Sequence, residues 1–154
     1  MSLSDIAVLI GNPVTHSLSP VFQQAAFDHM SINVRYEAWE THADELKQKV
    51  ALLRSSEYLG ANITIPYKLD AMSFVDSIDD IAEQVGAINT IISRNGTLVG
   101  TNTDVEGIQN SFKLANVDLK NKTVILFGAG GAARAVIVAM KNAGVKDITV
   151  INRT

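Results

Sequence analysis

The stretch VILFGAGGAAR, residues 124–134, decides the fold of this chain. Its first four residues predict a buried parallel strand, which leads through Gly128-x-Gly130-x-x-Ala133 into a helical pattern. At this spacing the first glycine allows a tight turn, the second permits close approach to the backbone, and the alanine packs the helix against the strand. A second apolar strand follows at 147–151. The segment therefore predicts a βαβ unit whose helix N-terminus can bind phosphate groups.

The predicted βαβ unit stops after its second strand, because the sequence ends at Thr154. A mononucleotide-binding half needs about three parallel strands, and two leave an apolar edge that can pair with another chain. We therefore expect the chain to be the first part of a longer protein and to be inactive alone. The alternative is a partner that supplies the missing strands. Association through the exposed sheet edge, as a homodimer or between fragments, is the expected protein contact.

The composition excludes several classes of function. The 154 residues carry a net charge of −3 and no cysteine, so we expect no nucleic-acid partner, disulfide or thiolate metal site. The three histidines, His16, His29 and His42, lack metal-ligand spacing, and we expect no metal. The N-terminus lacks the basic region of a signal peptide, and the most apolar segment, 124–140, is interrupted by three glycines and Arg134. We expect a cytoplasmic protein without membrane contact.

Hydrophobic periodicity predicts an α/β domain before the βαβ unit. A hairpin at Asn95-Gly96 makes its sheet mixed, because helices separate the other strands. We expect a three-layer α/β substrate domain over 1–102, a linking helix and boundary over 103–121, and an incomplete dinucleotide-binding (Rossmann) domain over 122–154. The expected strands of the first domain are 6–10, 34–39, 61–65, 87–93 and 97–100. Ser19, Thr41 and Ser77 are expected to cap the helices of this domain, and Thr103 is expected to cap the linking helix.

Two hydroxyls at a helix start form the first candidate for a binding site. Ser17 and Ser19 flank the expected beginning of a helix, where free N–H groups and the helix dipole suit an anionic carboxylate. The alternative is that Ser19 only caps the helix and Ser17 belongs to a loop.

The second candidate lies in NITIPYK, residues 62–68. Strand alternation places Asn62 and Thr64 on one face and the two isoleucines on the other. The proline ends the strand, so Lys68 follows at a strand C-terminal end, where α/β sheets bind ligands. The alternative is a half-buried strand followed by a solvated lysine.

The third candidate combines Asn89-Thr90 with Thr101-Asn102-Thr103-Asp104. Asp104 falls at the first position of an expected helix, where the helix dipole favours its ionised form. An ionised aspartate near Lys68 would make a proton-handling pair. The alternative is an aspartate that only stabilises its own helix.

Taken in order, these clusters resemble the motifs of the shikimate dehydrogenase family, and the resemblance covers the whole chain. GNPVxHSxSP at 11–20 is similar to the opening motif of that family, and GANITIPYK at 60–68 is similar to its catalytic-lysine motif. Three further stretches match family motifs: GAINT at 86–90, GTNTDxxG at 100–107 and GAGGA at 128–132. NRT at 152–154 resembles its adenosine-phosphate motif.

The resemblance implies NADP-dependent, reversible oxidation of shikimate to 3-dehydroshikimate, a step of chorismate and aromatic amino acid biosynthesis. It implies that Lys68 is the general acid/base and pairs with Asp104, and that Ser17 and Ser19 hold the substrate carboxylate. The implied ligands of the ring hydroxyls are Thr64, Asn89 and Asp104, with Asn62 nearby. The implied cofactor-binding residues are Gly128, Ala129, Gly130, Gly131, Ala132, Asn152, Arg153, Thr154 and Asp80.

Two alternatives stay open at this point. One, from a different class, is a non-catalytic small-molecule-binding or assembly module derived from this family. The other, within the enzyme class, is a quinate-preferring relative. The polar set at Lys68 and Asp104 favours an enzyme. Ser19 favours shikimate, because quinate-active relatives tend to carry threonine at the matching position.

Overall fold

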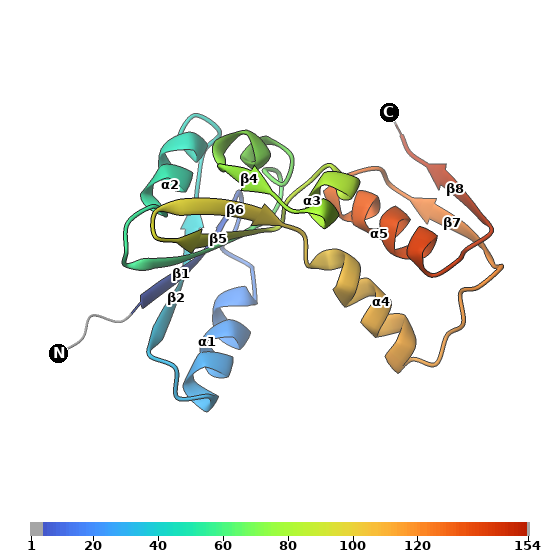
Figure 1. Ribbon diagram of the computed structural model, residues 1–154, viewed down its shortest axis with the longest axis horizontal. Coiled ribbons are helices and arrows are strands. Elements are labelled where there is room, and N and C mark those ends of the chain that lie inside the picture. Colours follow the sequence, from blue (N-terminus) through green and yellow to red (C-terminus); the bar gives the residue numbers. More distant parts are fainter. Residues whose placement is uncertain (1–4, 154) are drawn as a thin grey trace. The chain divides into compact units, whose positions relative to one another are not determined.

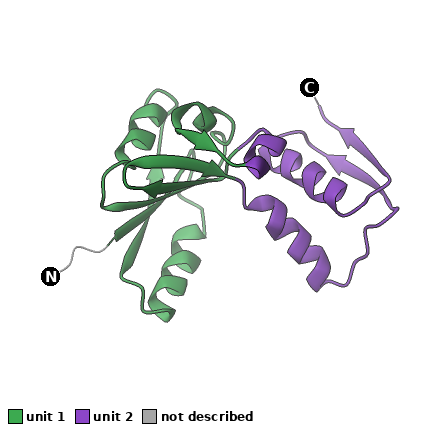
Figure 2. Ribbon diagram, in the orientation of Figure 1, with its two compact units in different colours: residues 1–79, 88–101 green, residues 80–87, 102–154 purple. Residues whose placement is uncertain are grey.

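The computed structural model describes residues 5–153 of the chain. The chain forms two compact units, drawn in different colours in Figure 2. Unit 1 comprises residues 1–79 and 88–101, and unit 2 comprises residues 80–87 and 102–154. The backbone therefore passes between the units after Asp79, Ala87 and Thr101.

Unit 1 is built on a six-stranded mixed sheet with the strand order β2-β1-β3-β5-β6-β4 (Figure 1). Its strands are β1 (Asp5–Gly11), β2 (Val34–Glu40), β3 (Tyr58–Ile63), β4 (Ser77–Ile78), β5 (Thr90–Arg94) and β6 (Thr97–Thr101). The β1 strand pairs parallel with β2 and β3, and β4 pairs parallel with β6. The β5 strand is antiparallel to both β3 and β6. The predicted mixed sheet is thus confirmed.

The apolar periodicity of the sequence explains how helix α2 (Leu46–Leu52) packs. Leu46, Val50 and the following Leu53 are at most 2% exposed, as a helix with apolar residues three to four positions apart requires. Burial of each such side chain contributes about 1.5–3 kcal/mol. This stripe makes α2 part of the core of unit 1.

Helix α1 (Ser19–His29) is attached to the sheet differently, because none of its residues is buried. Phe27 packs against the cluster of Leu9, Val14 and Tyr36. The Gln24 amide donates to Val34 O (3.0 Å) and accepts from Tyr36 N (2.8 Å). It thereby bonds to backbone groups of the edge strand β2 that would otherwise be open to another strand.

Unit 2 contains three helices and a two-stranded parallel sheet. Its elements are α3 (Asp80–Val85), α4 (Asp104–Leu114), β7 (Thr123–Phe127), α5 (Gly131–Asn142) and β8 (Asp147–Ile151). Helix α5 packs against α3 and α4 around a core of Val85, Ala87, Val105, Ala135, Val138 and Ala139. The predicted βαβ unit is confirmed. The prediction that β7 is buried is wrong, because Ile125 is 59% and Phe127 77% exposed and the residues of its other face, Val124 and Leu126, are only half-buried.

The ends of several elements differ from those predicted. The strand expected at 61–65 ends at Ile63, because Tyr67 N donates to Thr64 O (2.9 Å) and closes a turn. Ile63 is therefore 2% exposed and Ile65 71% exposed, so the two isoleucines do not share an environment as alternation predicted. The strand expected at 87–93 spans Thr90–Arg94.

Ser19 and Thr41 do not cap helices as predicted. Ser17 Oγ accepts from Ser19 N (3.2 Å), and the N-cap position of α1 is Leu18 rather than Ser19. Thr41 is buried and donates to Trp39 O, so it caps no helix.

The other two expected caps differ from each other, because only Thr103 lies at the start of a helix. Ser77 belongs to β4 and pairs with Val99. Thr103 occupies the N-cap position of α4 but makes no capping bond with its side chain. At the starts of α1 and α4, the backbone N–H groups bind the side chains of Ser17 and Asn102, which lie one or two residues before the expected caps.

The hairpin predicted at Asn95-Gly96 is confirmed. Both residues have positive φ, 52° and 79°, as a two-residue turn of this type requires. The turn also receives a side-chain bond, because Arg54 donates to Gly96 O (2.9 Å).

Arg54 joins this hairpin to two other segments of unit 1. Its guanidinium donates to both carboxylate oxygens of Asp76 (2.6 and 2.9 Å), and Leu98 N donates to the same carboxylate (2.8 Å). Hydrogen bonds from Arg54, and secondarily from the Leu98 backbone, lower the pKa of Asp76 to about 2. The pair therefore links the end of α2, the segment before β4 and the β5–β6 hairpin.

The stability of unit 1 should depend on pH through Asp76. Its folded-state pKa lies below the ordinary value of 3.8, so its charge stabilises the fold above about pH 4 and ceases to do so as the pH falls toward 2. We expect Asp76→Asn to lower the unfolding temperature at about pH 7 and the difference from wild type to vanish near pH 2. Fluorescence of Trp39, the single tryptophan, follows unit 1.

The control for this experiment is Asp44→Asn, which neutralises an exposed carboxylate outside the ion pair. We expect it to leave the transition of Trp39 fluorescence unchanged. If Asp76→Asn lowered the unfolding temperature by the same amount at about pH 7 and near pH 2, the stabilising role assigned to the Asp76 charge would be contradicted.

Candidate active site

The carboxyl ends of β1 and β3 lie side by side, and the chain leaves both strands at the same edge of the sheet. Thr64 N donates to Ile10 O and Asn12 N donates to Ile65 O, both at 2.9 Å. Gly11 lies between these bonds, and a Cβ built on it would be 2.3 Å from the Thr64 methyl carbon. Thr64 is therefore held directly against the end of β1.

Lys68 and Asn89 reach this edge through backbone hydrogen bonds. Ile88 N donates to Lys68 O (2.8 Å), and Ile63 N donates to Asn89 O (2.7 Å). Asn89 is 8% exposed, whereas Lys68 is half-buried. Three of the residues predicted to bind or transform substrate, Thr64, Lys68 and Asn89, thus come from adjoining backbone segments.

Of the two predicted anion-binding serines, Ser17 lies in the loop that follows β1 and Ser19 is the first residue of α1. Ser17 N donates to Val14 O (3.0 Å), and Ser17 Oγ accepts from Ser19 N (3.2 Å). Both serines are half-buried. Because Ser17 Oγ is the acceptor in this bond, its own proton can be donated to an anion.

Asn62, the remaining predicted residue of unit 1, is joined to Thr90 of the third candidate and to Tyr36, which the sequence analysis did not select. Tyr36 Oη donates to Asn62 Oδ1 (2.7 Å), and Asn62 Nδ2 donates to Thr90 Oγ1 (3.3 Å). Thr90 in turn donates to Asn89 Oδ1 (2.9 Å). No local signal marks Tyr36.

Asp104 belongs to unit 2 and is the first residue of α4, as predicted. Its backbone N–H donates to Asn102 Oδ1 (3.1 Å), and Asn102 Nδ2 donates to Ala87 O (2.9 Å). Asn102 is 3% exposed. This amide, part of the third candidate, fixes the start of the helix that carries Asp104.

The glycine loop of unit 2 leaves its backbone accessible. Gly128 has a φ of 106°, and Gly130 is the N-cap of α5. A Cβ built on either glycine would meet no atom within 4 Å. Gly128 N donates to Ile151 O (2.8 Å), which brings the loop to the end of β8, just before Arg153. The bare backbone therefore borders open space beside a helix N-terminus and an arginine.

The other predicted cofactor-binding residues lie around this loop. Gly131 is the first residue of α5, Ala129 and Ala132 are exposed, and Asn152 follows β8. Asp80 is exposed at the start of α3, a helix that packs against α5. Thr154 lies outside the described residues.

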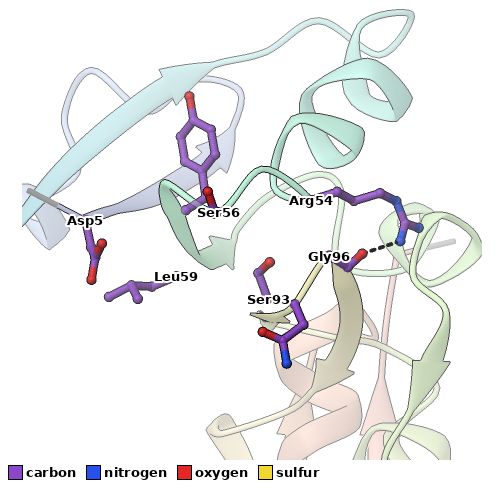
Figure 3. Close-up of a pocket in the computed structure, with 8 residues that line it drawn as sticks. Asp5, Arg54, Ser56, Leu59, Ser93 and Gly96 are labelled. Carbon is purple, nitrogen blue, oxygen red and sulfur yellow. Dashed lines mark hydrogen bonds between the residues drawn. The ribbon is translucent and has the colours of Figure 1, made fainter. Parts of the chain in front are cut away.

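A hollow of about 300 Å³ lies at the opposite ends of the unit 1 strands and contains none of the predicted residues. It is lined by Asp5, Arg54, Ser56, Tyr58, Leu59, Ser93, Asn95 and Gly96. Figure 3 shows the Arg54 guanidinium bonded to Gly96 at this hollow. Because Asp76 also neutralises that guanidinium, the hollow offers no unpaired cation to an anionic ligand.

Residues 5–153 contain neither a metal-binding cluster of side chains nor a helix that could span a membrane. No group of three or more His, Cys, Asp or Glu side chains in this range is placed to hold a metal ion. No helix in the same range has the length and apolar character needed to cross a membrane.

Comparison with known proteins matches the chain in two parts. A family model described as shikimate dehydrogenase substrate binding domain matches residues 9–91, and one described as shikimate / quinate 5-dehydrogenase matches residues 109–154. A shikimate dehydrogenase (NADP(+)) from Nitrosopumilus maritimus is 40% identical over 146 residues, which are 95% of this chain and 54% of that protein.

Solved structures show the same likeness. Shikimate dehydrogenase from Aquifex aeolicus has a TM-score of 0.94 at 38% identity, covering 100% of this chain and 57% of that chain. Shikimate 5-dehydrogenase from Thermus thermophilus, solved in complex with NADP(H) and shikimate, has a TM-score of 0.90 at 35% identity. That match covers 97% of this chain and 56% of the other.

The mixed-sheet unit followed by a glycine-loop βαβ unit defines an α/β protein with the beginning of a dinucleotide-binding fold. The chain belongs to the shikimate dehydrogenase family. The family and the fold class predicted from the motifs are therefore confirmed. The chain spans about half the length of the curated relatives it matches.

Gly11 should be essential for the position of Thr64. We expect Gly11→Ala to destabilise unit 1 by about 1–3 kcal/mol, because the added methyl group overlaps the Thr64 side chain and approaches Ile65 O to 2.9 Å. Denaturant unfolding followed by Trp39 fluorescence measures this loss. Gly107→Ala is the matched control, because a Cβ there meets nothing within 4 Å. Equal stability of Gly11→Ala and wild type would contradict the proposed close contact.

Proposed function

We propose that this chain forms the substrate-binding unit and part of the cofactor-binding unit of an NADP-dependent enzyme that reversibly oxidises shikimate to 3-dehydroshikimate. The observation that carries the proposal is the convergence of Thr64, Lys68 and Asn89 at the carboxyl ends of β1 and β3. Curated relatives over nearly the whole chain are named shikimate dehydrogenase (NADP(+)). This activity belongs to chorismate and aromatic amino acid biosynthesis.

Substrate binding is assigned to hydroxyl and amide groups together with one carboxylate. Ser17 and Ser19 hold the carboxylate, and a hydrogen bond to such a charged group contributes about 1.5–3 kcal/mol. The ring hydroxyls are assigned to Thr64, Asn89 and Asp104, with Asn62 nearby. Hydroxyl and amide groups can both donate and accept, which matches a ligand that carries several hydroxyls.

Proton transfer is assigned to Lys68 and Asp104. During oxidation, the Lys68 amine takes the proton of the reacting hydroxyl at Nζ while a hydride leaves the carbon that bears it. In the reverse reaction Lys68 returns the proton to the developing alkoxide. Asp104 orients the hydroxyl and completes the proton-handling pair. A positioned acid/base of this kind contributes roughly 10²–10⁴ in rate.

The residues of unit 2 fit a dinucleotide. The accessible backbone at Gly128 and Gly130, beside the N-terminus of α5, suits a pyrophosphate, and no acidic residue lies in the first turn of that helix. Ala129, Gly131 and Ala132 complete this loop, and Asp80 is assigned to the cofactor because its helix packs on α5. Bound NADP would supply the nicotinamide ring that accepts the hydride.

Preference for NADP over NAD is assigned to the residues after β8. NAD-binding sites of this fold place a carboxylate at the end of the second strand to bind the ribose 2′-hydroxyl. Here Asn152, Arg153 and Thr154 follow that strand, and Arg153 is exposed. A guanidinium matches the oxygens of a 2′-phosphate, whereas no carboxylate is present there to repel them.

Location and association belong to the same proposal. A biosynthetic enzyme that uses NADP fits the cytoplasm. The exposed apolar side chains of β7 and β8, among them Phe127 at 77% and Ile151 at 48%, support association of this chain through that sheet, as a homodimer or between fragments. Sedimentation of the chain at several concentrations tests this association. A chain that stays monomeric at every concentration would contradict it.

Lys68→Ala tests the proposed reaction. In the protein at the full length of its relatives, we expect kcat for shikimate oxidation to fall roughly 10²–10⁴-fold with a much smaller change in KM, because proton transfer acts in the transition state. Lys47→Ala, which removes an exposed lysine of α2, is the control. A wild-type protein that binds shikimate without oxidising it would indicate a binding module, and faster oxidation of quinate would indicate the quinate-preferring alternative.

Arg153→Ala tests the proposed cofactor preference. We expect the ratio of kcat/KM for NADP to that for NAD to fall about tenfold to a hundredfold, because one charge-assisted interaction with phosphate is lost. Lys146→Ala, before β8, removes a nearby positive charge as control. Equal use of the two cofactors by the wild type, or an unchanged ratio in the variant, would refute this role of Arg153.

A further inference from the structure

A continuous row of side-chain hydrogen bonds joins residues of three strands of unit 1, passing over β1, and ends at the proposed substrate site. It starts at Tyr36 on β2, passes through Asn62 on β3 and Thr90 on β5, and ends at Asn89. We propose that Tyr36 and Thr90 are positioning residues of the shikimate site, which fix the direction of the Asn62 and Asn89 amides. This inference rests on the function proposed above.

The row has a single direction. Tyr36 has one hydroxyl proton and donates it to Asn62 Oδ1 at 2.7 Å. That bond turns the Nδ2 group of Asn62 toward Thr90 Oγ1 at 3.3 Å. Thr90 also has one hydroxyl proton and donates it to Asn89 Oδ1 at 2.9 Å. Each donor therefore determines the orientation of the next group.

Asn62 has a different part in this arrangement from the one its motif implies. The two ends of its amide are used by Tyr36 and Thr90, so Asn62 connects the row to Asn89. This connecting role explains why Asn62 lies near the proposed site of the substrate hydroxyls. It transmits the orientation imposed by Tyr36 to the amide that is proposed to bind a hydroxyl.

The first donor of the row is held rigidly. Tyr36 is 8% exposed, and its ring packs with Leu9, Val14 and Phe27. Its backbone N–H donates to Gln24 Oε1 (2.8 Å), which fixes the residue from the side of α1. A rotation of the Tyr36 ring would require repacking of this cluster, so its hydroxyl has a defined position.

The protonation state of Tyr36 keeps the row in one direction. Burial raises the pKa of Tyr36 to about 12. The phenol therefore remains a hydrogen-bond donor at neutral and moderately alkaline pH, and the orientation of the two amides does not change over that range.

Shikimate titrations of this chain and its variants, followed by NMR, test the proposal. We expect Tyr36→Phe and Thr90→Val each to weaken binding about threefold to tenfold, which corresponds to the loss of one neutral hydrogen bond. The double variant should have the same affinity for shikimate as whichever single variant binds it less tightly, because both substitutions interrupt the same row. Thr90→Ser keeps the hydroxyl and should bind as wild type.

Matched controls remove a hydroxyl of the same kind outside the row. Tyr58→Phe alters the tyrosine at the other end of β3, and Ser93→Ala removes a hydroxyl of β5 that bonds to Leu53 O (2.6 Å). Both should leave the affinity for shikimate unchanged. Trp39 fluorescence verifies that each variant is folded. If Tyr36→Phe does not fold, the contrast between Thr90→Val and Thr90→Ser decides the question.

A second ligand separates positioning from a general structural defect. Cyclohex-1-ene-1-carboxylate shares the ring and carboxylate of shikimate but has no hydroxyl for the oriented amide to bind. We expect Tyr36→Phe and Thr90→Val to leave its affinity unchanged. Equal weakening for both ligands, additive effects in the double variant, or variants that bind shikimate as wild type would each overturn the positioning role. Failure of the wild type to bind shikimate would instead overturn the proposed function, and the inference with it.

Discussion

The position of β3 between a parallel and an antiparallel neighbour is the constraint on which the candidate site depends. On one side, Gly60 with a φ of 146° approaches β5 so closely that a Cβ there would be 2.0 Å from Ile91 O. On the other side, Gly11 of β1 makes room for Thr64. Glycine is required at Gly60 because another residue would meet both the strained φ and the carbonyl. These two contacts fix where the chain leaves β3 and therefore where Lys68 lies.

Polar groups around this edge are held by other polar groups, which pre-organises them. Tyr67, the residue before Lys68, donates its hydroxyl to Thr41 O (2.7 Å), and the Thr41 hydroxyl donates to Trp39 O (2.9 Å). Within residues 5–153, no buried side-chain nitrogen or oxygen lacks a hydrogen-bond partner. A ligand that binds here meets groups already oriented, so less free energy is spent on ordering them.

The two units present different kinds of polar group to a ligand. Unit 1 presents side chains whose directions are set by neighbouring side chains, as in the row from Tyr36 to Asn89. Unit 2 presents backbone at Gly128 and Gly130, where the absence of a Cβ leaves the helix N-terminus accessible. Side chains can distinguish the hydroxyls of a small substrate, whereas backbone N–H groups suit a phosphate that many cofactors share.

The sequence by itself determined the α/β class, most of the elements, the hairpin at Asn95-Gly96 and the glycine loop, because each depends on local periodicity or on a local demand for positive φ. It also marked the residues that meet at the end of β3. Only the tertiary structure decided that Ile65 is exposed, that Ser77 joins the sheet and that Tyr36 reaches the candidate site. Tyr36 and Asn62 are 26 residues apart, and Asn62 and Thr90 are 28 apart. Contacts over such separations depend on strand order, which no local pattern encodes.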